Sequence, residues 1–597
     1  MKKILLLALG VLSIFPIYAQ VNFPPVFKND TANIRLDKLT RLYIAPRRVV
    51  WVNNHDAVKD ENMLTMLSDG QNQLGNQNMC RMQTTSGDTA SIILDYGREL
   101  HGGIKMMFGT SDHKYPAQIR LRFGESVEET CCELYKGDDY NPIGEGTNDH
   151  AIRDAILSIP QMGMIEFGNT GFRFVRIDLI SPNRQIELKE TSAIFRFRNI
   201  PWVGSFKCSD DRLTKIWETG AYTIHLNMQE NIWDGIKRDR LIWLGDMHPE
   251  TSSIATVFGD DDSFYSSLDL ACKYFPLPGW LNGMSAYSMW YLIIQHDWYM
   301  QNKNTAFLQK HKPYIMGLID QIDNKVDEEG NETIGDHFLD WPSNNNQEGV
   351  TAGYRALMIW AMKDAEILCN ILNDNAHATK CRAIAQRLKK QTPDPNGLKQ
   401  AAALMAIAGT MSPKEACDKY ISVDGPKNFS TFYEYYMLEA LALDGKYQEA
   451  MDIISRFWGG MLDLGATSFW EDFNLDWAKD AAGIDELVPA GKKDIHGDFG
   501  AYCYPGYRHS LCHGWASGPT AWMSHHILGV EITKAGCEEL TITPHLGKLQ
   551  WAEGTYPTPK GPVYIKHQKK ANGKVSTIIK GPEDVKIVVK EATIVNN

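Results

Sequence analysis

The pattern of hydrophobic and polar positions changes twice along the chain. Up to about residue 203, apolar and polar residues alternate, as in Ile119–Phe123 and Ile194–Arg198. Ser91–Gly97 and Ile104–Gly109 also have strand character, and the pair Gly102–Gly103 between them predicts a turn. Alternation of period two, broken by Gly, Asp and Asn, is typical of an antiparallel sandwich. We therefore predict an N-terminal β-sandwich region over residues 20–203.

From about residue 204 the apolar residues take up helical spacing. Ser209 can cap a helix whose apolar positions include Leu213, Trp217 and Ile224. Further helices are predicted at about 285–301, 304–325, 353–372, 376–391, 398–409, 431–443, 446–458 and 514–527. Many helices without interleaved strands predict an all-α domain over residues 204–530. The spacing does not show whether helical hairpins close into a ring.

Strands return after about residue 530. Val563–His567 and Val575–Ile579 are joined through Asn572–Gly573, which is a strong hairpin signal. Leu540–Pro544 and Val585–Val589 are the other strand candidates. The sequence thus predicts a small C-terminal β-sandwich domain over residues 531–597, and the order of the chain is β, then α, then β.

The N-terminus resembles an export signal. Two lysines are followed by the apolar run Ile4–Ile17 and by the small residue Ala19. We expect a signal peptide over residues 1–19, cleaved after Ala19, and a mature protein in the periplasm or secreted. The run is short for a membrane span, so no membrane insertion is expected.

The charge limits the classes of binding partner, and the cysteine content limits the disulfides and metal sites that can be expected. A net charge of −12 argues against a nucleic-acid or anionic-membrane partner. Eleven scattered cysteines without a CxxC pair indicate neither a disulfide framework nor a zinc site, although one or two disulfides stay open. The acidic run Gly259–Ser263 lacks the EF-hand spacing and is expected to be a solvated loop. No metal or other cofactor is predicted.

The stretch 234–250 carries the strongest chemical signal. Its acidic residues surround an aromatic ring and are interleaved with arginines: Asp234, Asp239, Asp246 and Glu250, with Trp243, Arg238 and Arg240. If the stretch is helical, Asp239, Trp243, Asp246 and Glu250 share one face. A ring beside carboxylates suits a sugar site, because the ring packs on the apolar face of a pyranose. The alternative is a charged, solvent-facing helix with a tryptophan anchor.

Three more groups of acidic, aromatic or histidine residues follow in loops of the helical region. They are Asp340–Trp341, Trp470–Glu471, and His513 with Trp515. Each alone is weak, because an Asp-Trp pair is often a cap or a core contact and a single histidine is often a core residue. Together in one domain they indicate a site.

These motifs resemble those of glycoside hydrolase family 78, the bacterial α-L-rhamnosidases. Residues 234–246 match the pattern Asp-Cys-Pro-x-Arg-Glu-Gln-x-x-Trp-x-Gly-Asp at Asp234, Arg238, Trp243, Gly245 and Asp246. Segments 465–471 and 512–518 resemble the family's Gly-Ala-Thr-Thr-x-Trp-Glu and Asn-His-Tyr-x-x-Gly, and 339–341 its Gly-Asp-Trp with Leu in place of Gly. The resemblance implies a central (α/α)6 six-hairpin barrel flanked by β-sandwiches.

The resemblance also implies residue roles. Glu471 is the expected general base, and Asp234 and Asp246 are expected to hold sugar hydroxyls. The family's general acid is Glu, but Asp239 stands at that position, and its carboxyl lies about 1.5 Å further back. Glu250 stays open as a substitute acid. Other candidate sugar contacts are Arg238, Trp243, Asp340, Trp341, Trp470, His513 and Trp515.

An inverting exo-glycosidase needs two carboxyl groups about 6.5–9.5 Å apart and no cofactor. The leading hypothesis is an α-L-rhamnosidase that acts on rhamnose-containing oligo- or polysaccharides. The alternatives are another six-hairpin glycosidase, for α-L-fucosides or unsaturated uronides, and a catalytically impaired carbohydrate-binding homologue. An arginine such as Arg238 or Arg240 would suit a uronide carboxylate. The sequence leaves the linkage and the oligomeric state open.

Overall fold

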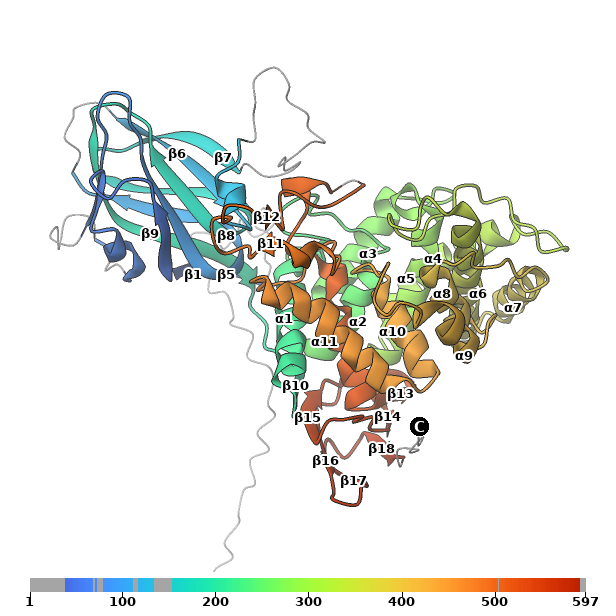
Figure 1. The fold of residues 1–597 in the computed structure, drawn as a ribbon. Helices are drawn as coiled ribbons and strands as arrows, with labels where there is room; N and C mark the ends of the chain where they lie inside the picture. Colours follow the sequence, from blue (N-terminus) through green and yellow to red (C-terminus); the bar gives the residue numbers. More distant parts are fainter. Residues whose placement is uncertain are drawn as a thin grey trace, which may run out of the picture. The chain divides into compact units, whose positions relative to one another are not determined.

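The computed structural model describes residues 38–67, 70–71, 79–110, 116–133, 153–502 and 504–590. The predicted signal peptide at residues 1–19 and Cys503 lie outside the described residues. Within the described part, Figure 1 shows an N-terminal β region, a helical middle and a short C-terminal β region in chain order.

The N-terminal region forms one antiparallel sheet. Its strand order is β3-β4-β9-β5-β8-β6-β7, with β1 paired to β9 and β2 to β5. The strands are β1 Leu39–Ile44, β2 Arg48–Val52, β3 Val58–Lys59, β4 Cys80–Gln83, β5 Ala90–Phe108, β6 Ala117–Gly124, β7 Asp154–Ile159, β8 Gly163–Leu179 and β9 Gln185–Arg198. The predicted strands at Ile119–Phe123 and Ile194–Arg198 are confirmed.

The predicted turn at Gly102–Gly103 is wrong, because β5 continues through both glycines. Gly102 has φ +144°, and a Cβ there would lie 1.9 Å from the Ile194 carbonyl oxygen of β9. The glycines therefore mark a close approach of two paired strands and not a chain reversal.

The helical region has helices in all the predicted stretches and three more among the described residues. Its α-helices are α1 Asp211–Asn227, α2 Met247–Val257, α3 Asp262–Tyr274, α4 Ser285–Asn302, α5 Thr305–Asp323, α6 Gln347–Ile371, α7 Asn375–Leu388, α8 Lys399–Ala408, α9 Pro413–Ala416, α10 Glu434–Leu443, α11 Tyr447–Asp463 and α12 Gly518–Trp522. Helix α6 begins at Gln347, earlier than predicted, and the segment predicted as 514–527 divides into a 3-10 turn, α12 and a π turn. Helices α2, α3 and α9 were not predicted.

One N-cap and one loop differ from the prediction. Asp210, not Ser209, caps α1, because its carboxylate accepts hydrogen bonds from the amides of Arg212 at 2.9 Å and Leu213 at 3.3 Å. In the acidic run expected to be solvated, Asp261 is buried: it caps α3 and forms an ion pair with Arg198 at 2.7 Å.

Two small sheets form the C-terminal region. One has the order β10-β15-β16-β17, with β10 Ser205–Cys208, β15 Trp551–Tyr556, β16 Val563–Lys569 and β17 Val575–Lys580. The other joins β13 Val530–Lys534, β14 Glu539–Ile542 and β18 Lys586–Val589. The hairpin at Asn572–Gly573 is confirmed. Strand β10 lies inside the range predicted to be helical. It pairs with β15, which lies more than 300 residues later in the sequence.

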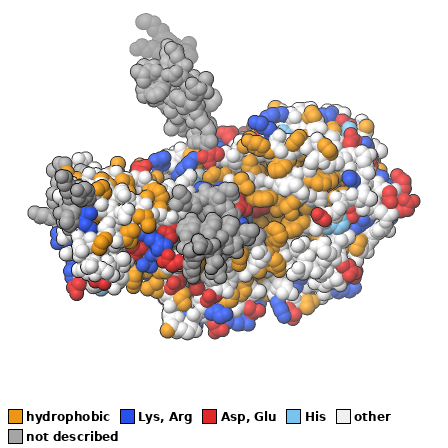
Figure 2. All heavy atoms as spheres, turned by 90° about the horizontal axis from the view of Figure 1, so that it is seen from above, with side chains coloured by type: hydrophobic (Ala, Val, Ile, Leu, Met, Phe, Trp, Pro, Cys, Tyr) orange, Lys and Arg blue, Asp and Glu red, His pale blue; other side chains and the backbone are white. Residues whose placement is uncertain are grey.

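The ten described cysteines are all free thiols. Among the described helices, none combines the length and the apolar character that a membrane crossing requires. Figure 2 shows basic and acidic side chains interspersed over the face that it draws, with hydrophobic side chains gathered toward the middle of that face.

The close approach at Gly102 generates a stability prediction. In Gly102→Ala the new methyl group meets backbone atoms that belong to a paired strand, so we expect the free energy of unfolding to fall by roughly 3 kcal/mol. Gly573→Ala is the matched control, because Gly573 also has positive φ but has open space around it, and we expect it to cost only about 1 kcal/mol. Urea denaturation followed by circular dichroism measures both. Equal losses in the two variants would show that the backbone conformation alone, and not the contact with β9, accounts for the glycine at position 102.

Candidate active site

The acidic stretch 234–246 is a loop, so the hypothesis of one helical face is wrong. Helix α2 begins only at Met247, and Asp239 and Arg240 have φ values of 54° and 52°. Two successive non-glycine residues in the left-handed region cannot continue a helix, and such strain is concentrated at functional sites. The loop is closed by Asp234, whose Oδ1 accepts a hydrogen bond from the Leu241 amide at 2.9 Å.

Glu471 lies buried in the loop that follows α11, and both its backbone and its side chain are fixed. Its amide donates to the Ser510 carbonyl at 2.9 Å, and its Oε2 accepts from the Ser510 amide at 3.1 Å. Trp515 Nε1 donates to the Glu471 carbonyl at 3.0 Å, and the Thr431 hydroxyl donates to the same oxygen. Trp515 therefore holds the chain of Glu471 in place.

Arg238 joins the two candidate catalytic carboxylates. Its Nη2 pairs with Glu471 Oε1, and its Nη1 lies 3.1 Å from Asp239 Oδ2. Its Nε donates to the Arg508 carbonyl at 3.0 Å, which fixes the guanidinium. One planar guanidinium therefore contacts both carboxyl groups and brings them into the same site.

The charges around Glu471 keep it ionised. Burial alone would raise the pKa of this carboxyl, but Arg238, His513, His509 and the Ser510 amide together hold the pKa below its ordinary value. Glu471 is therefore a carboxylate near neutral pH, which is the form that a general base requires.

Three other carboxyl groups of the site behave in the opposite way. Burial, followed by the neighbouring carboxylates, raises the pKa of Glu250 well above its ordinary value. The pKa values of Asp234 and Asp246 are also raised by burial, although His513 lowers both. His513 Nε2 lies 3.2 Å from Asp246 Oδ1. The site thus holds one ionised base beside carboxyl groups that retain protons more readily.

Asp239 and Glu250 differ in their access to the site. The Asp239 side chain is 20% exposed, whereas Glu250 is 1% exposed and lies against Gly514, where a Cβ would come within 1.9 Å of Glu250 Oε1. Only Asp239 is therefore open to a substrate from solvent.

The tryptophans fall into two groups. Trp341 is 37% exposed and Trp243 is partly buried, so both can present a ring face. Trp470 is 1% exposed and packs edge-on against Phe473, which is the position of a core residue. Asp340 beside Trp341 is buried, and its carboxylate accepts hydrogen bonds from the Ser343 amide at 3.0 Å and the Ser430 hydroxyl at 2.7 Å.

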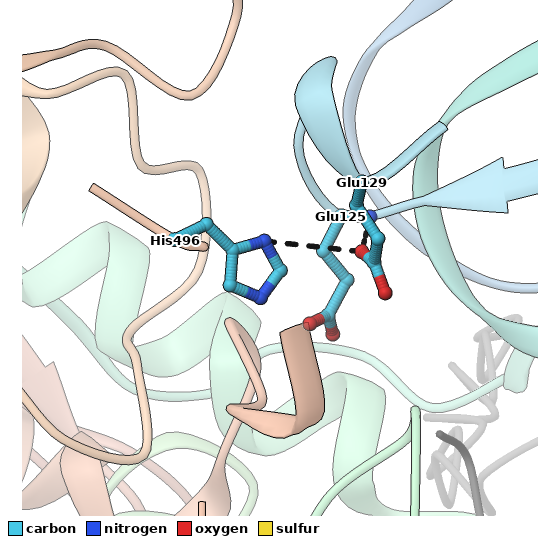
Figure 3. A group of neighbouring side chains, drawn as sticks. All are labelled: Glu125, Glu129 and His496. Carbon is cyan, nitrogen blue, oxygen red and sulfur yellow. Dashed lines mark hydrogen bonds and ion pairs between the residues drawn. The ribbon is translucent and has the colours of Figure 1, made fainter. Parts of the chain in front are cut away.

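A buried ion cluster behind the site was not predicted from the sequence. Lys237, next to Arg238, places its fully buried ammonium 2.9 Å from Glu129 and 3.3 Å from Glu125, both of which follow β6. Figure 3 shows these two glutamates of the β region facing His496 of the helical region, and His496 Nδ1 lies 3.9 Å from Glu129 Oε2. The donor set could suit a cation, but the Lys237 ammonium already supplies that charge.

The same cluster also contacts residues 509–511, the segment that binds the Glu471 carboxylate through Ser510. Lys237 Nζ donates to the His509 carbonyl at 2.8 Å, and the Leu511 amide donates to Glu125 Oε2 at 2.7 Å. The β region therefore holds the loop of Arg238 and the loop that contacts Glu471. The lysine lies inside the acidic motif, but its partners are more than a hundred residues earlier, so no local pattern reveals them.

Replacing Lys237 tests this bracing. In Lys237→Met the two glutamates stay buried without their ammonium partner, so we expect a loss of roughly 3–5 kcal/mol in the free energy of unfolding. The control Lys215→Met removes a lysine whose pair with Glu218 is exposed at 3.9 Å, and we expect a change below about 0.5 kcal/mol. Chemical denaturation gives both values. A loss in Lys237→Met as small as the control's would contradict the bracing role.

Comparisons with known proteins show which sequence family and which solved structures this chain resembles. Residues 201–394 match the sequence model of the bacterial alpha-L-rhamnosidase six-hairpin glycosidase domain. A comparison with curated proteins finds no match to the chain. The motif loop 234–246 lies inside the matched range, whereas Glu471 lies beyond it.

Solved rhamnosidase structures share the fold. A GH78 family rhamnosidase of Bacillus sp. GL1 is 20% identical, with a TM-score of 0.68 over 86% of this chain and 54% of that one. A rhamnosidase from Klebsiella oxytoca with rhamnose bound is 19% identical, with a TM-score of 0.62 over 81% and 95%. A Streptomyces avermitilis alpha-L-rhamnosidase complexed with L-rhamnose is 15% identical, with a TM-score of 0.62 over 84% and 48%.

This chain spans about half the length of the Bacillus and Streptomyces proteins. At these identities the likeness concerns the fold. Residues 201–394 therefore resemble the six-hairpin glycosidase domain of bacterial α-L-rhamnosidases, and the chain shares the fold of the solved rhamnosidase structures.

Proposed function

We propose that this protein is an exported, inverting exo-glycosidase that removes terminal α-L-rhamnose from plant or microbial glycans. The observation that carries the proposal is the guanidinium of Arg238, which contacts both Asp239 and Glu471. The contact brings one solvent-accessible carboxyl group and one buried carboxylate into the same site, and glycoside hydrolysis uses such a pair of carboxyl groups.

In the proposed reaction, Glu471 removes a proton from a water molecule, and the water attacks the anomeric carbon. Asp239 gives its proton to the glycosidic oxygen as the bond to the leaving group breaks. Arg238 serves both groups, because it keeps Glu471 ionised before the reaction and contacts the Asp239 carboxylate that the reaction produces. The configuration at the anomeric carbon inverts, since water and leaving group lie on opposite faces of the ring.

Recognition of the sugar needs an apolar wall and hydrogen-bonding groups. Rhamnose is a 6-deoxy sugar, and Trp243 and Trp341 offer ring surface for its methyl group and its apolar face. Asp234, Asp246 and His513 supply polar atoms for its hydroxyls; Asp246 and His513 already contact each other at 3.2 Å, which fixes their orientation.

The finer architecture and the location of the protein belong to the same proposal. The helical hairpins of residues 211–527 would close into an (α/α)6 barrel, as the six-hairpin family match suggests. The N-terminal residues 1–19 would direct export, and the mature chain would act in the periplasm or outside the cell.

The arginines of the loop favour a neutral sugar over a uronide. A uronide carboxylate would require a guanidinium that is available to pair with it. Arg238 is engaged by Glu471, Asp239 and the Arg508 carbonyl, and Arg240 Nη1 donates to the Asn169 carbonyl at 2.9 Å. A rhamnoside or another deoxy sugar requires no such cation.

Hydrolysis of aryl α-L-rhamnosides, with α-L-fucosides and unsaturated uronides as competing substrates, tests the proposal. We expect Glu471→Gln to lower kcat about 10³-fold on every leaving group, because the attacking water loses its base. Asp239→Asn should lose a similar factor on natural aglycones but little on nitrophenol, which leaves without a proton donor. Glu250→Gln is the matched control among buried acids. Full activity of Glu471→Gln, or a leaving-group dependence in Glu250→Gln instead of Asp239→Asn, would refute the assigned roles.

The ion pair between Arg238 and Glu471 also predicts how the activity depends on pH. Loss of its charge in Arg238→Gln raises the pKa of Glu471, so the base becomes protonated, and activity falls, at a higher pH than in the native protein. We expect the acidic limb of kcat/KM to move upward by about one to three pH units. Arg240→Gln is the control from the same loop and should leave that limb in place. An acidic limb unchanged in Arg238→Gln would show that the guanidinium does not set the ionisation of the base.

A further inference from the structure

A cavity of about 810 Å³ lies apart from the carboxylates of the proposed glycosidase site. Helices α2, α4, α6 and α10 supply one side of it, and residues of the C-terminal β region supply another. Its described lining includes His248, His296, Asp297, Trp360 and Tyr436, and it includes neither Asp239 nor Glu471. The proposed glycosidase reaction therefore makes no use of it.

Two members of a cluster of three potential metal ligands, His296 and Asp297, line this cavity, and the third, Asp364, lies next to them. His296 and Asp297 come from α4, and Asp364 comes from α6. His296 Nδ1 lies 2.8 Å from Asp297 Oδ1 and 3.8 Å from Asp364 Oδ1, and a donor atom from each of the three residues falls within 4.8 Å of the others. Donors bound to one metal at about 2.0–2.2 Å lie roughly 3–4 Å from one another, so small side-chain shifts suffice.

Two further observations, independent of these distances, indicate that a ligand binds here. Asp364 is only 7% exposed, and its Oδ2 accepts no hydrogen bond from the described residues. A buried carboxylate oxygen without a partner is costly, and a cation would satisfy it. The Asp297 side chain is 45% exposed although it lines the cavity, so its carboxylate faces open space.

His248 of α2 holds Asp297 in position. Its Nε2 lies 3.1 Å from Asp297 Oδ2, and its Nδ1 lies 3.0 Å from the Tyr436 hydroxyl. The ring stacks on Trp290 at 5.1 Å and on Tyr436 at 5.6 Å, which fixes its plane. Hydrogen bonds that orient a ligating carboxylate in this way are a regular feature of metal sites.

We propose that His296, Asp297 and Asp364 bind a divalent transition-metal ion such as zinc, with His248 as the positioning residue for Asp297. One imidazole nitrogen and two carboxylates suit zinc or manganese better than calcium, which prefers oxygen donors alone. The remaining coordination positions would face the cavity and admit water or a small oxygen ligand. The ion would also join α4 to α6.

The cluster beside Lys237 provides a contrast. There the cation between Glu125 and Glu129 is a lysine ammonium of the chain itself, at 2.9 Å from Glu129. In the cluster of His296, Asp297 and Asp364, the ion pairs described for the two aspartates are with histidines. Unlike a lysine ammonium, the His296 imidazole can release its proton and then bind a metal through a ring nitrogen.

Metal binding to the untagged full chain tests the proposal without using enzyme activity. Chain stripped with a chelator and dialysed is titrated with zinc chloride by calorimetry, and with cobalt chloride while the visible absorption of the cobalt is recorded. We expect one ion per chain, a cobalt spectrum of a bound site, and a rise in the thermal unfolding midpoint on adding zinc. Asp364→Asn and His296→Gln should each weaken binding at least tenfold, and His248→Gln should weaken it about 10-fold to 100-fold.

His526→Gln is the matched control. His526 lines the same cavity but lies 3.0 Å from Glu439, away from the three ligands, so its loss should leave zinc affinity unchanged. Circular dichroism of each variant establishes that it is folded. No stoichiometric binding to the native chain, or equal affinity in folded Asp364→Asn and in the native chain, would overturn the proposal. Loss of binding in His526→Gln alone would assign the ion to other residues and overturn it as well.

Discussion

The buried ammonium of Lys237 is the interaction on which the site depends most. It is surrounded by Glu125 and Glu129 of the β region and by the His509 carbonyl of the helical region. Buried charges are tolerated only when they are paired and hydrogen-bonded, so the two regions must meet correctly for this group to be satisfied. Because Arg238 is the next residue, the geometry of the catalytic loop follows from the way the β region and the helical region meet.

Arg238 then divides the carboxyl groups of the site into two classes. For the four buried groups, Glu471, Asp234, Asp246 and Glu250, burial acts in the direction that raises the pKa. Next to the Arg238 guanidinium, Glu471 nevertheless has a lowered pKa, whereas Asp234, Asp246 and Glu250 have raised values. The guanidinium that contacts Glu471 thus contributes to the contrast between this carboxylate and its proton-retaining neighbours Asp234, Asp246 and Glu250, and acid–base catalysis uses contrasts of this kind.

Much of the fold could be predicted from the sequence, because strand alternation and helical spacing are local properties. The strand at Ile119–Phe123 and the helices at 285–301 and 398–409 are examples that the structure confirms. Gly102 was misread as a turn, since a glycine that permits close strand contact and a glycine in a turn look alike without the paired strand. The motif loop was misread as helical because residue spacing does not show the positive φ of Asp239 and Arg240.

The candidate site was predictable where it lies in motifs, and not where it depends on distant partners. The acidic loop and Trp470–Glu471 stand out in the sequence, and the structure joins them through Arg238. Glu125 and Glu129, which brace the loop, follow a strand far from any motif. The cavity ligands Asp297 and Asp364 lie on two helices, where charged residues are ordinarily on the surface. Only the packing of α4 on α6 brings them together.

The most direct test of the central claim is the anomeric configuration of the first sugar released from an aryl α-L-rhamnoside, followed by proton NMR before mutarotation. The roles proposed for Glu471 as base and Asp239 as acid, acting on opposite sides of the glycosidic bond, predict β-L-rhamnose as the first product. Release of α-L-rhamnose would mean that a carboxylate attacks the sugar directly, and it would contradict the assignment of Glu471 as a base acting on water.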